Sequence, residues 1–196
     1  MEKETISRIG GAMKERDLVF VDTETTGLDA NLHEVIEIAF VRVKQEWISG
    51  EKTKFTILNE WSAKMKPEHI ETADPKAFLV NGYTPSEWAD SISAEDAFKQ
   101  FSEKTDGAIM VAHNVAFDSG FIDKYFNKFG IKNKMHYCRL DTISMAYVCL
   151  GNNQEINGYS LPELCSYFEI PNEGAHSALP DARMDFELFK KLIEFK

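Results

Sequence analysis

The stretch that decides the fold is residues 18–27, LVFVDTETTG, where an apolar run leads directly into two carboxylates. Residues 18–21 are large, apolar and partly β-branched, which is typical of a buried strand. Because side chains alternate between the two faces of a strand, Asp22 and Glu24 point the same way. Two carboxylates on one face repel each other unless a cation lies between them. The stretch therefore leaves two interpretations open, a metal site and an ordinary turn at a strand end.

A second motif is found at residues 113–118, HNVAFD, directly after the apolar residues 108–112. The apolar positions that follow have helical spacing, which predicts a helix starting at the end of a strand. Asp118 lies at or near the first turn of that helix. A carboxylate there is often a capping residue, because the unpaired N–H groups of a helix start stabilise it. Capping and metal binding are therefore both open for Asp118.

A third motif is found at residues 176–181, HSALPD. Pro180 suits the first position of a helix, and the apolar residues between 186 and 193 predict that a helix follows. Asp181 then lies in the first helical turn, with His176 on the preceding loop. Taken alone, Asp181 is a favourable charge at a helix start and His176 is a surface loop residue.

Together the three motifs resemble those of the DEDDh (DnaQ-like) 3′–5′ exonuclease family, and the resemblance runs from end to end of the chain. It rests on Asp22 and Glu24 in the first motif, Asp118 in the second, and His176 with Asp181 in the third. These five positions occur in the family's order, each in the expected strand or helix context. The resemblance implies a metal-dependent exonuclease that releases 5′-mononucleotides from the 3′ end of single-stranded or frayed DNA.

The cofactors implied by the resemblance are two divalent metal ions, Mg²⁺ or Mn²⁺. Both are hard ions that prefer oxygen ligands, and four acidic side chains suit two of them. In this family's arrangement, Asp22 bridges both ions, Glu24 and Asp181 complete the site of the one that activates water, and Asp118 supports the other. Such a pair can stabilise both the attacking and the leaving oxygen of a phosphodiester.

The resemblance makes His176 the general base. An unperturbed histidine has a pKa near 6.5, so it can take a proton from the attacking water around neutral pH. Its expected position on a loop would let the side chain move in once substrate is bound.

Substrate contacts are implied at further matching positions, since the segment after the first motif lies beside the terminal sugar in the family. Residues 80–84, VNGYT, resemble a segment that lies near the substrate. For Leu28, contact with the terminal base and packing in the core are both open. The substrate-binding residues that we expect are Thr25, Thr26, Gly27, Leu28, Asn81, Asn114 and Phe117.

The composition agrees with one enzyme domain. The chain has 196 residues, 43% of them hydrophobic, which is enough to build a sizeable core. It has no apolar segment long enough to span a bilayer, and residues 1–17 lack the apolar stretch of a signal peptide. The three cysteines lack paired metal-ligand spacing. We therefore expect reduced thiols, a cytoplasmic protein and no membrane partner.

The net charge of −10 does not exclude nucleic acid as a partner. Four of the acidic groups would bind metal ions, which reverse the local field. An enzyme that binds only single-stranded DNA or RNA 3′ ends also needs few phosphate contacts. The densest basic stretch is more typical of a solvated helix face than of a strand guide. That stretch comprises Lys124, Lys128, Lys132, Lys134 and Arg139.

The predicted fold is α/β, a ribonuclease H-like mixed sheet in which an antiparallel meander and parallel strands are flanked by helices. We expect a short N-terminal segment at 1–16 and one exonuclease domain at 17–196. The predicted strands are 19–22, 35–43, 53–58, 108–112 and 137–140, with Gly50 in the second turn. The predicted helices are 73–80, 94–103, 142–149, 161–168, one beginning at Asp118 and one beginning at Pro180.

Several alternatives remain open at this point. An exoribonuclease would use the same five residues, and a non-catalytic binding module could keep the same fold. A DNA polymerase is a further candidate partner, although the last helix reaches almost to Lys196, which favours a free-standing enzyme. The sequence leaves the oligomeric state unknown.

Overall fold

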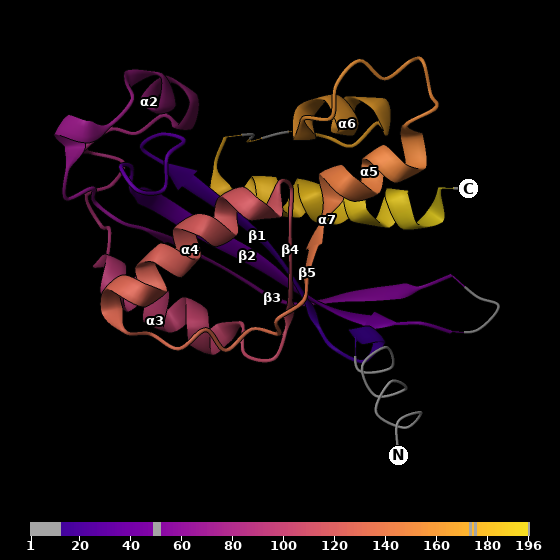
Figure 1. Cartoon of the computed structure of the whole chain (residues 1–196), viewed down its shortest axis with the longest axis horizontal. Coiled ribbons are helices and arrows are strands. Elements are labelled where there is room, and N and C mark those ends of the chain that lie inside the picture. Colours follow the sequence, from indigo (N-terminus) through magenta and orange to yellow (C-terminus); the bar gives the residue numbers. More distant parts are fainter. Residues whose placement is uncertain (1–12, 49–51, 173, 175, 196) are drawn as a thin grey trace.

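The computed structural model describes residues 13–48, 52–172, 174 and 176–195 (Figure 1). Its centre is a five-stranded sheet with the strand order β3-β2-β1-β4-β5. The strands are β1 (Leu18–Thr25), β2 (Val35–Glu46), β3 (Lys54–Lys64), β4 (Ile109–Ala112) and β5 (Arg139–Asp141). The helices are η1 (Ile70–Thr72), α2 (Pro75–Asn81), α3 (Ala94–Lys104), α4 (Val115–Phe129), α5 (Thr142–Leu150), α6 (Leu161–Tyr167) and α7 (Ala178–Glu194).

The sheet combines both kinds of strand pairing. β1, β2 and β3 form an antiparallel meander, whereas β4 lies parallel to β1 and β5 lies parallel to β4. This confirms the predicted mixed sheet. The carboxyl ends of β1, β4 and β5 meet at one edge of the sheet, where open α/β sheets bind their ligands.

Helices cover both faces of the sheet, and β1 contributes side chains to both layers. Val19 and Val21 pack with residues of α3 and α4 in one cluster, while Leu18 and Phe20 pack with α7 in another. The rings of Phe20 and Phe186 lie 5.0 Å apart between their centroids. A third cluster joins α5 and α6 to α7. Figure 1 shows α7 crossing behind the sheet, with α5 and α6 beside it.

Three predicted helix starts are wrong. The helix expected from residue 73 begins at Pro75, after its N-cap Asp74. The helix expected from Asp118 begins at Val115, because the carboxylate of Asp141 accepts the N–H groups of Asn114 and Val115 and so caps an earlier start. The last helix begins at Ala178, which makes Pro180 its third residue and not its first. Proline is tolerated there because the first N–H groups of a helix have no acceptor within the helix.

The third strand is longer than predicted. β3 runs to Lys64, well beyond the expected end at residue 58, because it pairs with β2 as far as Glu37 opposite Lys64. The expected turn at Gly50 and residues 1–12 of the expected N-terminal segment lie outside the described residues. Within the described part of the chain, none of the helices combines the length and the apolar character needed to cross a bilayer.

Candidate active site

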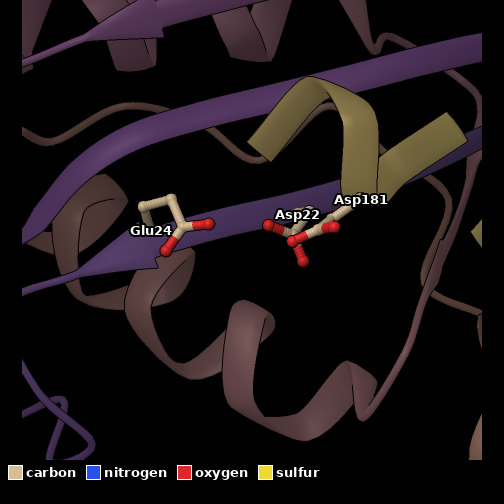
Figure 2. A group of neighbouring side chains, drawn as sticks. All are labelled: Asp22, Glu24 and Asp181. Carbon is tan, nitrogen blue, oxygen red and sulfur yellow. The ribbon is translucent and has the colours of Figure 1, made fainter. Parts of the chain in front are cut away.

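The alternation of β1 carries two carboxylates to the α7 face of the sheet. Asp22 and Glu24 continue the row of Leu18 and Phe20, so both lean toward the N-terminal end of α7. Asp181, in the first turn of α7, meets them there. One carboxylate oxygen from each of the three residues lies within 4.8 Å of the others. Figure 2 shows the three side chains converging.

Asp118 reaches the same edge of the sheet from the opposite face. It lies in the first turn of α4, is buried, and accepts a hydrogen bond of 2.8 Å from the hydroxyl of Thr23. Thr23 belongs to the row of Val19 and Val21, which faces α4. Asp118 therefore stands outside the three-residue cluster, but its charge is close enough to raise the pKa of Asp22.

The four carboxyl groups of the site all have raised pKa values. Burial raises the pKa of Asp22 well above its ordinary value, and the charges of Asp118 and Glu24 add to that effect. Burial also raises the pKa of Glu24 to about 7, helped by Asp181 and Glu37, and that of Asp118 to about 7. Burial raises the pKa of Asp181 as well. Crowded carboxylates that resist ionisation in this way are typical of a cation site.

The donor set fits hard divalent cations. Among the described residues, no lysine or arginine forms an ion pair with Asp22, Glu24, Asp118 or Asp181. Within the described part of the chain, the cluster therefore has no counter-charge from a lysine or arginine side chain. Carboxylate oxygens are the ligands that Mg²⁺ and Mn²⁺ prefer. These four residues could hold such ions.

His176 lies next to the acidic cluster on an exposed turn. Its backbone has a left-handed conformation with φ of 70°, and its N–H donates to a carboxylate oxygen of Asp181 at 3.1 Å. The charge of His176 acts to lower the pKa of Asp181. The loop position expected from the sequence is therefore confirmed, with the backbone of His176 anchored to the cluster and its side chain exposed.

A pocket of about 340 Å³ opens beside Glu24. Thr25, Gly27, Leu28, Asn81 and Phe117 line it, so five of the expected substrate residues meet there. Leu28 is 82% exposed, which excludes the interpretation that it packs in the core. A Cβ atom on Gly27 would lie 2.5 Å from the ring of His33, so this position requires glycine.

Four of the expected residues have polar groups engaged in hydrogen bonds within the fold. Thr25 and Thr26 are buried, and Thr26 exchanges hydrogen bonds with Glu34 through both its backbone and its hydroxyl. Asn81 donates its amide to the carbonyl of Thr25 at 3.0 Å. Asn114 precedes α4 with φ of 70°. Of these four residues, Thr25 and Asn81 line the pocket, whereas Thr26 and Asn114 are not part of its lining.

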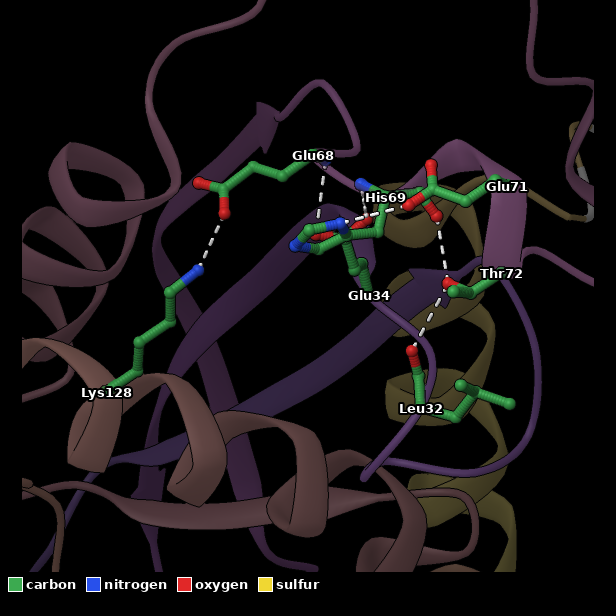
Figure 3. A network of polar contacts seen from close by, with 7 residues as sticks. All are labelled: Leu32, Glu34, Glu68, His69, Glu71, Thr72 and Lys128. Carbon is green, nitrogen blue, oxygen red and sulfur yellow. Dashed lines mark hydrogen bonds and ion pairs between the residues drawn. The ribbon is translucent and has the colours of Figure 1, made fainter.

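The wall of the pocket is fastened through Glu34, which the sequence did not single out. Its buried carboxylate accepts the N–H groups of Glu68 at 3.1 Å and His69 at 2.8 Å (Figure 3). Lys128 pairs with Glu68 at 2.8 Å. The amide N–H of Asp74 also donates to the carbonyl of Thr26. The segment that leads into α2 is thereby tied to the end of β1.

The basic stretch between residues 124 and 139 also forms contacts within the protein. Lys124 donates to the carbonyl of His33 at 2.7 Å, and Arg139 pairs with Asp123 at 2.9 Å. With Lys128, three of its five residues have partners within the protein. A nucleic acid strand is not needed to explain them.

Two more acidic residues near the site were also missed. Glu37 lies opposite Glu24 in the pairing of β1 with β2, and burial raises its pKa. Asp185 lies one helical turn after Asp181 on α7 and is 2% exposed. The four-residue spacing from Asp181 to Asp185 was a signal that could have found the second of these.

Comparison with known proteins identifies the class of this site. The sequence matches the exonuclease family (RNase_T) over residues 19–189, a range that includes all three motifs. The chain belongs to the exonuclease family. The expected DEDDh, DnaQ-like class is thereby confirmed, and the domain is an enzyme of the 3′–5′ exonuclease type.

Individual relatives agree with this membership of the exonuclease family. The chain is 30% identical over 181 residues to the DNA polymerase III subunit epsilon of Escherichia coli (strain K12), covering 87% of this chain and 69% of that protein. It is 29% identical over 182 residues to the PolC-type DNA polymerase III of Bacillus cereus, of which it covers 12%.

The structure of Escherichia coli exonuclease I in complex with a dT13 oligonucleotide supports the assignment of the fold. It superimposes with a TM-score of 0.74 at 20% sequence identity, covering 92% of this chain and 41% of that one. The ribonuclease H-like fold expected from the sequence is confirmed. The chain therefore has both the family membership and the fold of an exonuclease.

Proposed function

We propose that this protein removes 5′-mononucleotides one at a time from the 3′ end of single-stranded or frayed DNA, using two divalent ions, Mg²⁺ or Mn²⁺. The observation that carries the proposal is the convergence of Asp22, Glu24 and Asp181 within 4.8 Å, beside a pocket large enough for a terminal nucleotide. We take the exonuclease domain as residues 17–196, a range that contains the family match over residues 19–189.

DNA is the preferred substrate in this proposal for two reasons. The relatives with similar sequences are named as parts of DNA polymerase III, and the similar solved structure contains a dT13 oligonucleotide. Leu28 supports the terminal-nucleotide site, because its exposed side chain faces the pocket where a base could pack against it. The names of the relatives also make a DNA polymerase a candidate partner, which co-purification with the cell's replicative polymerase would test.

The carboxylates are assigned to binding the ions. Asp22 would serve both ions, Glu24 and Asp181 would complete the site of one, and Asp118 would support the other. The bound ions would supply positive charge that activates the attacking water and stabilises the phosphoryl oxygens. Thr23 keeps Asp118 in place through its 2.8 Å hydrogen bond.

His176 is assigned as the general base. It takes the proton of the attacking water, whose oxygen forms a bond to the terminal phosphorus. The bond from phosphorus to the 3′ oxygen of the penultimate nucleotide breaks, and that oxygen takes a proton from solvent. The products are a 5′-mononucleotide and a strand shortened by one. The exposed turn at His176 leaves its side chain free to approach the phosphate once a strand is bound.

The test uses purified protein with 5′-labelled single-stranded DNA and RNA of one sequence, in Mg²⁺, Mn²⁺ and EDTA. The expected result is a metal-dependent ladder that shortens from the 3′ end, faster on DNA than on RNA. A faster ladder on RNA would overturn the choice of substrate. If the parent protein produces no ladder on either strand, and so is as inactive as the Asp22→Asn variant, the proposed reaction itself is overturned.

A further inference from the structure

A partly buried polar chain of four groups lies beside the acidic cluster and has no part in the proposed reaction. The carbonyl oxygen of Tyr159 lies 2.8 Å from His113 Nε2, and His113 Nδ1 lies 3.0 Å from Thr142 Oγ1. Thr142 Oγ1 in turn lies 2.5 Å from Asp185 Oδ1 and, at the longer distance of 3.4 Å, near the carbonyl oxygen of Ala112. Thr142 is fully buried and Asp185 is 2% exposed. The chain links β4, α5, α7 and the loop before α6.

The positions of the hydrogens follow from counting donors along this chain. A backbone carbonyl only accepts, so His113 must carry a hydrogen on Nε2. In a neutral imidazole the other nitrogen is then an acceptor, and the hydroxyl of Thr142 must donate to it. A hydroxyl has a single hydrogen. The short contact between Thr142 and Asp185 therefore needs its hydrogen from the carboxyl of Asp185.

The alternative arrangement moves that proton to His113. His113 would then be an imidazolium that donates to Thr142, and Thr142 would donate to an ionised Asp185. This state places two charges in a buried region, which is costly. Burial lowers the pKa of His113 and raises that of Asp185 to about 7, so both shifts favour the uncharged state.

The surroundings of Asp185 agree with the uncharged form. Its second oxygen, Oδ2, is buried and has no hydrogen-bond partner among the described residues. An unpartnered carbonyl oxygen is far less costly to bury than an unpartnered oxygen of an ionised carboxylate. The charges of Asp118, Asp141 and Asp22 all disfavour a further negative charge on Asp185, whereas a hydrogen bond donated by Thr142 would favour it.

We propose that Asp185 is a positioning residue that works as a protonated, uncharged hydrogen-bond donor, locking α7 to the ends of β4 and β5. Asp185 shares α7 with Asp181, while His113 directly precedes the turn that starts α4 and carries Asp118. This hydrogen-bonded link therefore sets the relative positions of Asp181 and Asp118, the two proposed metal-binding carboxylates that lie on helices. Its effect on activity rests on the proposed function, whereas its protonation state does not.

The test compares two substitutions that differ only in their hydrogen bonding. Asp185→Asn keeps the size and lets the amide donate to Thr142, so it imitates the protonated acid. Asp185→Leu removes the donor at similar size. We expect Asp185→Asn to keep exonuclease activity within about threefold of the parent and the same Mg²⁺ midpoint. We expect Asp185→Leu to lose at least about tenfold in activity and to need more Mg²⁺.

Nitrogen-15 NMR of the His113 ring provides a readout that needs no activity. The expected result is a neutral ring with its proton on Nε2 at pH 7, both in the parent and in Asp185→Asn. Asp123→Asn is the matched control, because Asp123 forms a partly exposed ion pair with Arg139 away from this chain. It is expected to change neither the ring signals nor the activity.

Two results would overturn the proposal. One is an imidazolium at His113 in the parent that becomes neutral in Asp185→Asn, since that would mean an ionised Asp185. The other is a loss of activity and Mg²⁺ affinity in Asp185→Asn as complete as in Asp22→Asn, since that would make Asp185 a metal ligand. If the parent shows no nuclease activity, the proposed function fails, while the NMR result still decides the state of Asp185.

Discussion

The acidic cluster and the wall of the neighbouring pocket are built in different ways, although they share the end of β1. The cluster and the neighbouring Asp118 together take their side chains from a strand and the first turns of two long helices, whose geometry is regular. The wall consists of the loop after β1 and the short helix α2, fastened by contacts such as those of Glu34. Regular elements fix the chemistry, and individual side-chain contacts shape the surface that meets the substrate.

The largest effect is expected from the cluster. Asp22→Asn should lower kcat by at least about 1,000-fold, because a lost bridging ligand removes several kcal/mol of charge stabilisation. In EDTA the same variant should melt at a higher temperature than the parent, since one of the crowded carboxylates no longer resists ionisation. Calorimetry with and without Mg²⁺ would measure this. A variant that melts lower in EDTA would contradict the strain inferred for the cluster.

A substitution at His176 should impair the reaction without impairing the binding of ions. His176→Ala should lower kcat by about 10²- to 10⁴-fold, the usual contribution of a general base. The rise in melting temperature on adding Mg²⁺ should stay as in the parent, because the carboxylates are untouched. Full activity in this variant, measured on the labelled DNA ladder, would rule out the role of general base.

The stability of the metal-free protein should depend on pH through the cluster. Glu24 and Asp118 both have pKa values of about 7 in the folded protein, above those of exposed carboxyls. The folded state therefore binds more protons than the unfolded state between about pH 4 and pH 7, so stability falls as pH rises through this range. Because a pKa difference of one corresponds to about 1.4 kcal/mol, we expect the two groups together to cost several kcal/mol of stability across this range.

Urea unfolding in EDTA at several pH values would measure this loss. Asp22→Asn is the informative control, because removing one charge of the cluster should make the pH dependence shallower. Stability that stays flat or rises between pH 5 and pH 7 would contradict the assignment of raised pKa values to the cluster.

A substitution that loosens the wall of the pocket should weaken substrate binding. Glu34→Gln leaves one of the N–H groups of Glu68 and His69 without its acceptor, which should cost about 1–3 kcal/mol of stability. KM for DNA should rise several-fold while kcat changes less, and amide exchange should speed up at residues 68–74. A fall in kcat without a change in KM would mean that Glu34 supports the cluster and not the wall.

The smallest effect is expected from Leu28. The side chain is 82% exposed, so Leu28→Ala should leave the unfolding free energy unchanged. If the terminal base packs against it, the variant loses about 1 kcal/mol of binding, which raises KM about fivefold. Steady-state kinetics on a short DNA oligonucleotide would measure this. An unchanged KM would show that Leu28 does not contact the substrate.

The cluster could be predicted from the sequence because each of its residues stands at a regular place. The two-residue period of β1 puts Asp22 and Glu24 on one face, and the apolar spacing after residue 118 and after residue 181 reveals helices. The errors concern the helix starts, where a distant side chain decides. Asp141, more than twenty residues later in the chain, caps α4 and moves its start to Val115.

The wall could not be predicted in the same way. Glu34 meets the N–H of Glu68 thirty-four residues further along the chain, and nothing in the spacing of charges reveals such a contact. The polar chain from Tyr159 to Asp185 is equally long-range. The length of β3 also depends on its pairing with β2, which the apolar pattern of residues 53–58 did not show.

The raised pKa values of the cluster have a consequence for how the protein takes up metal. Near pH 7, Glu24 and Asp118 are partly protonated in the folded protein, and a carboxyl must give up its proton before it can bind a cation. Loading with Mg²⁺ should therefore release protons into solution. The heat measured on titration should then vary with the ionisation enthalpy of the buffer, and an unbuffered sample should turn more acidic as it fills.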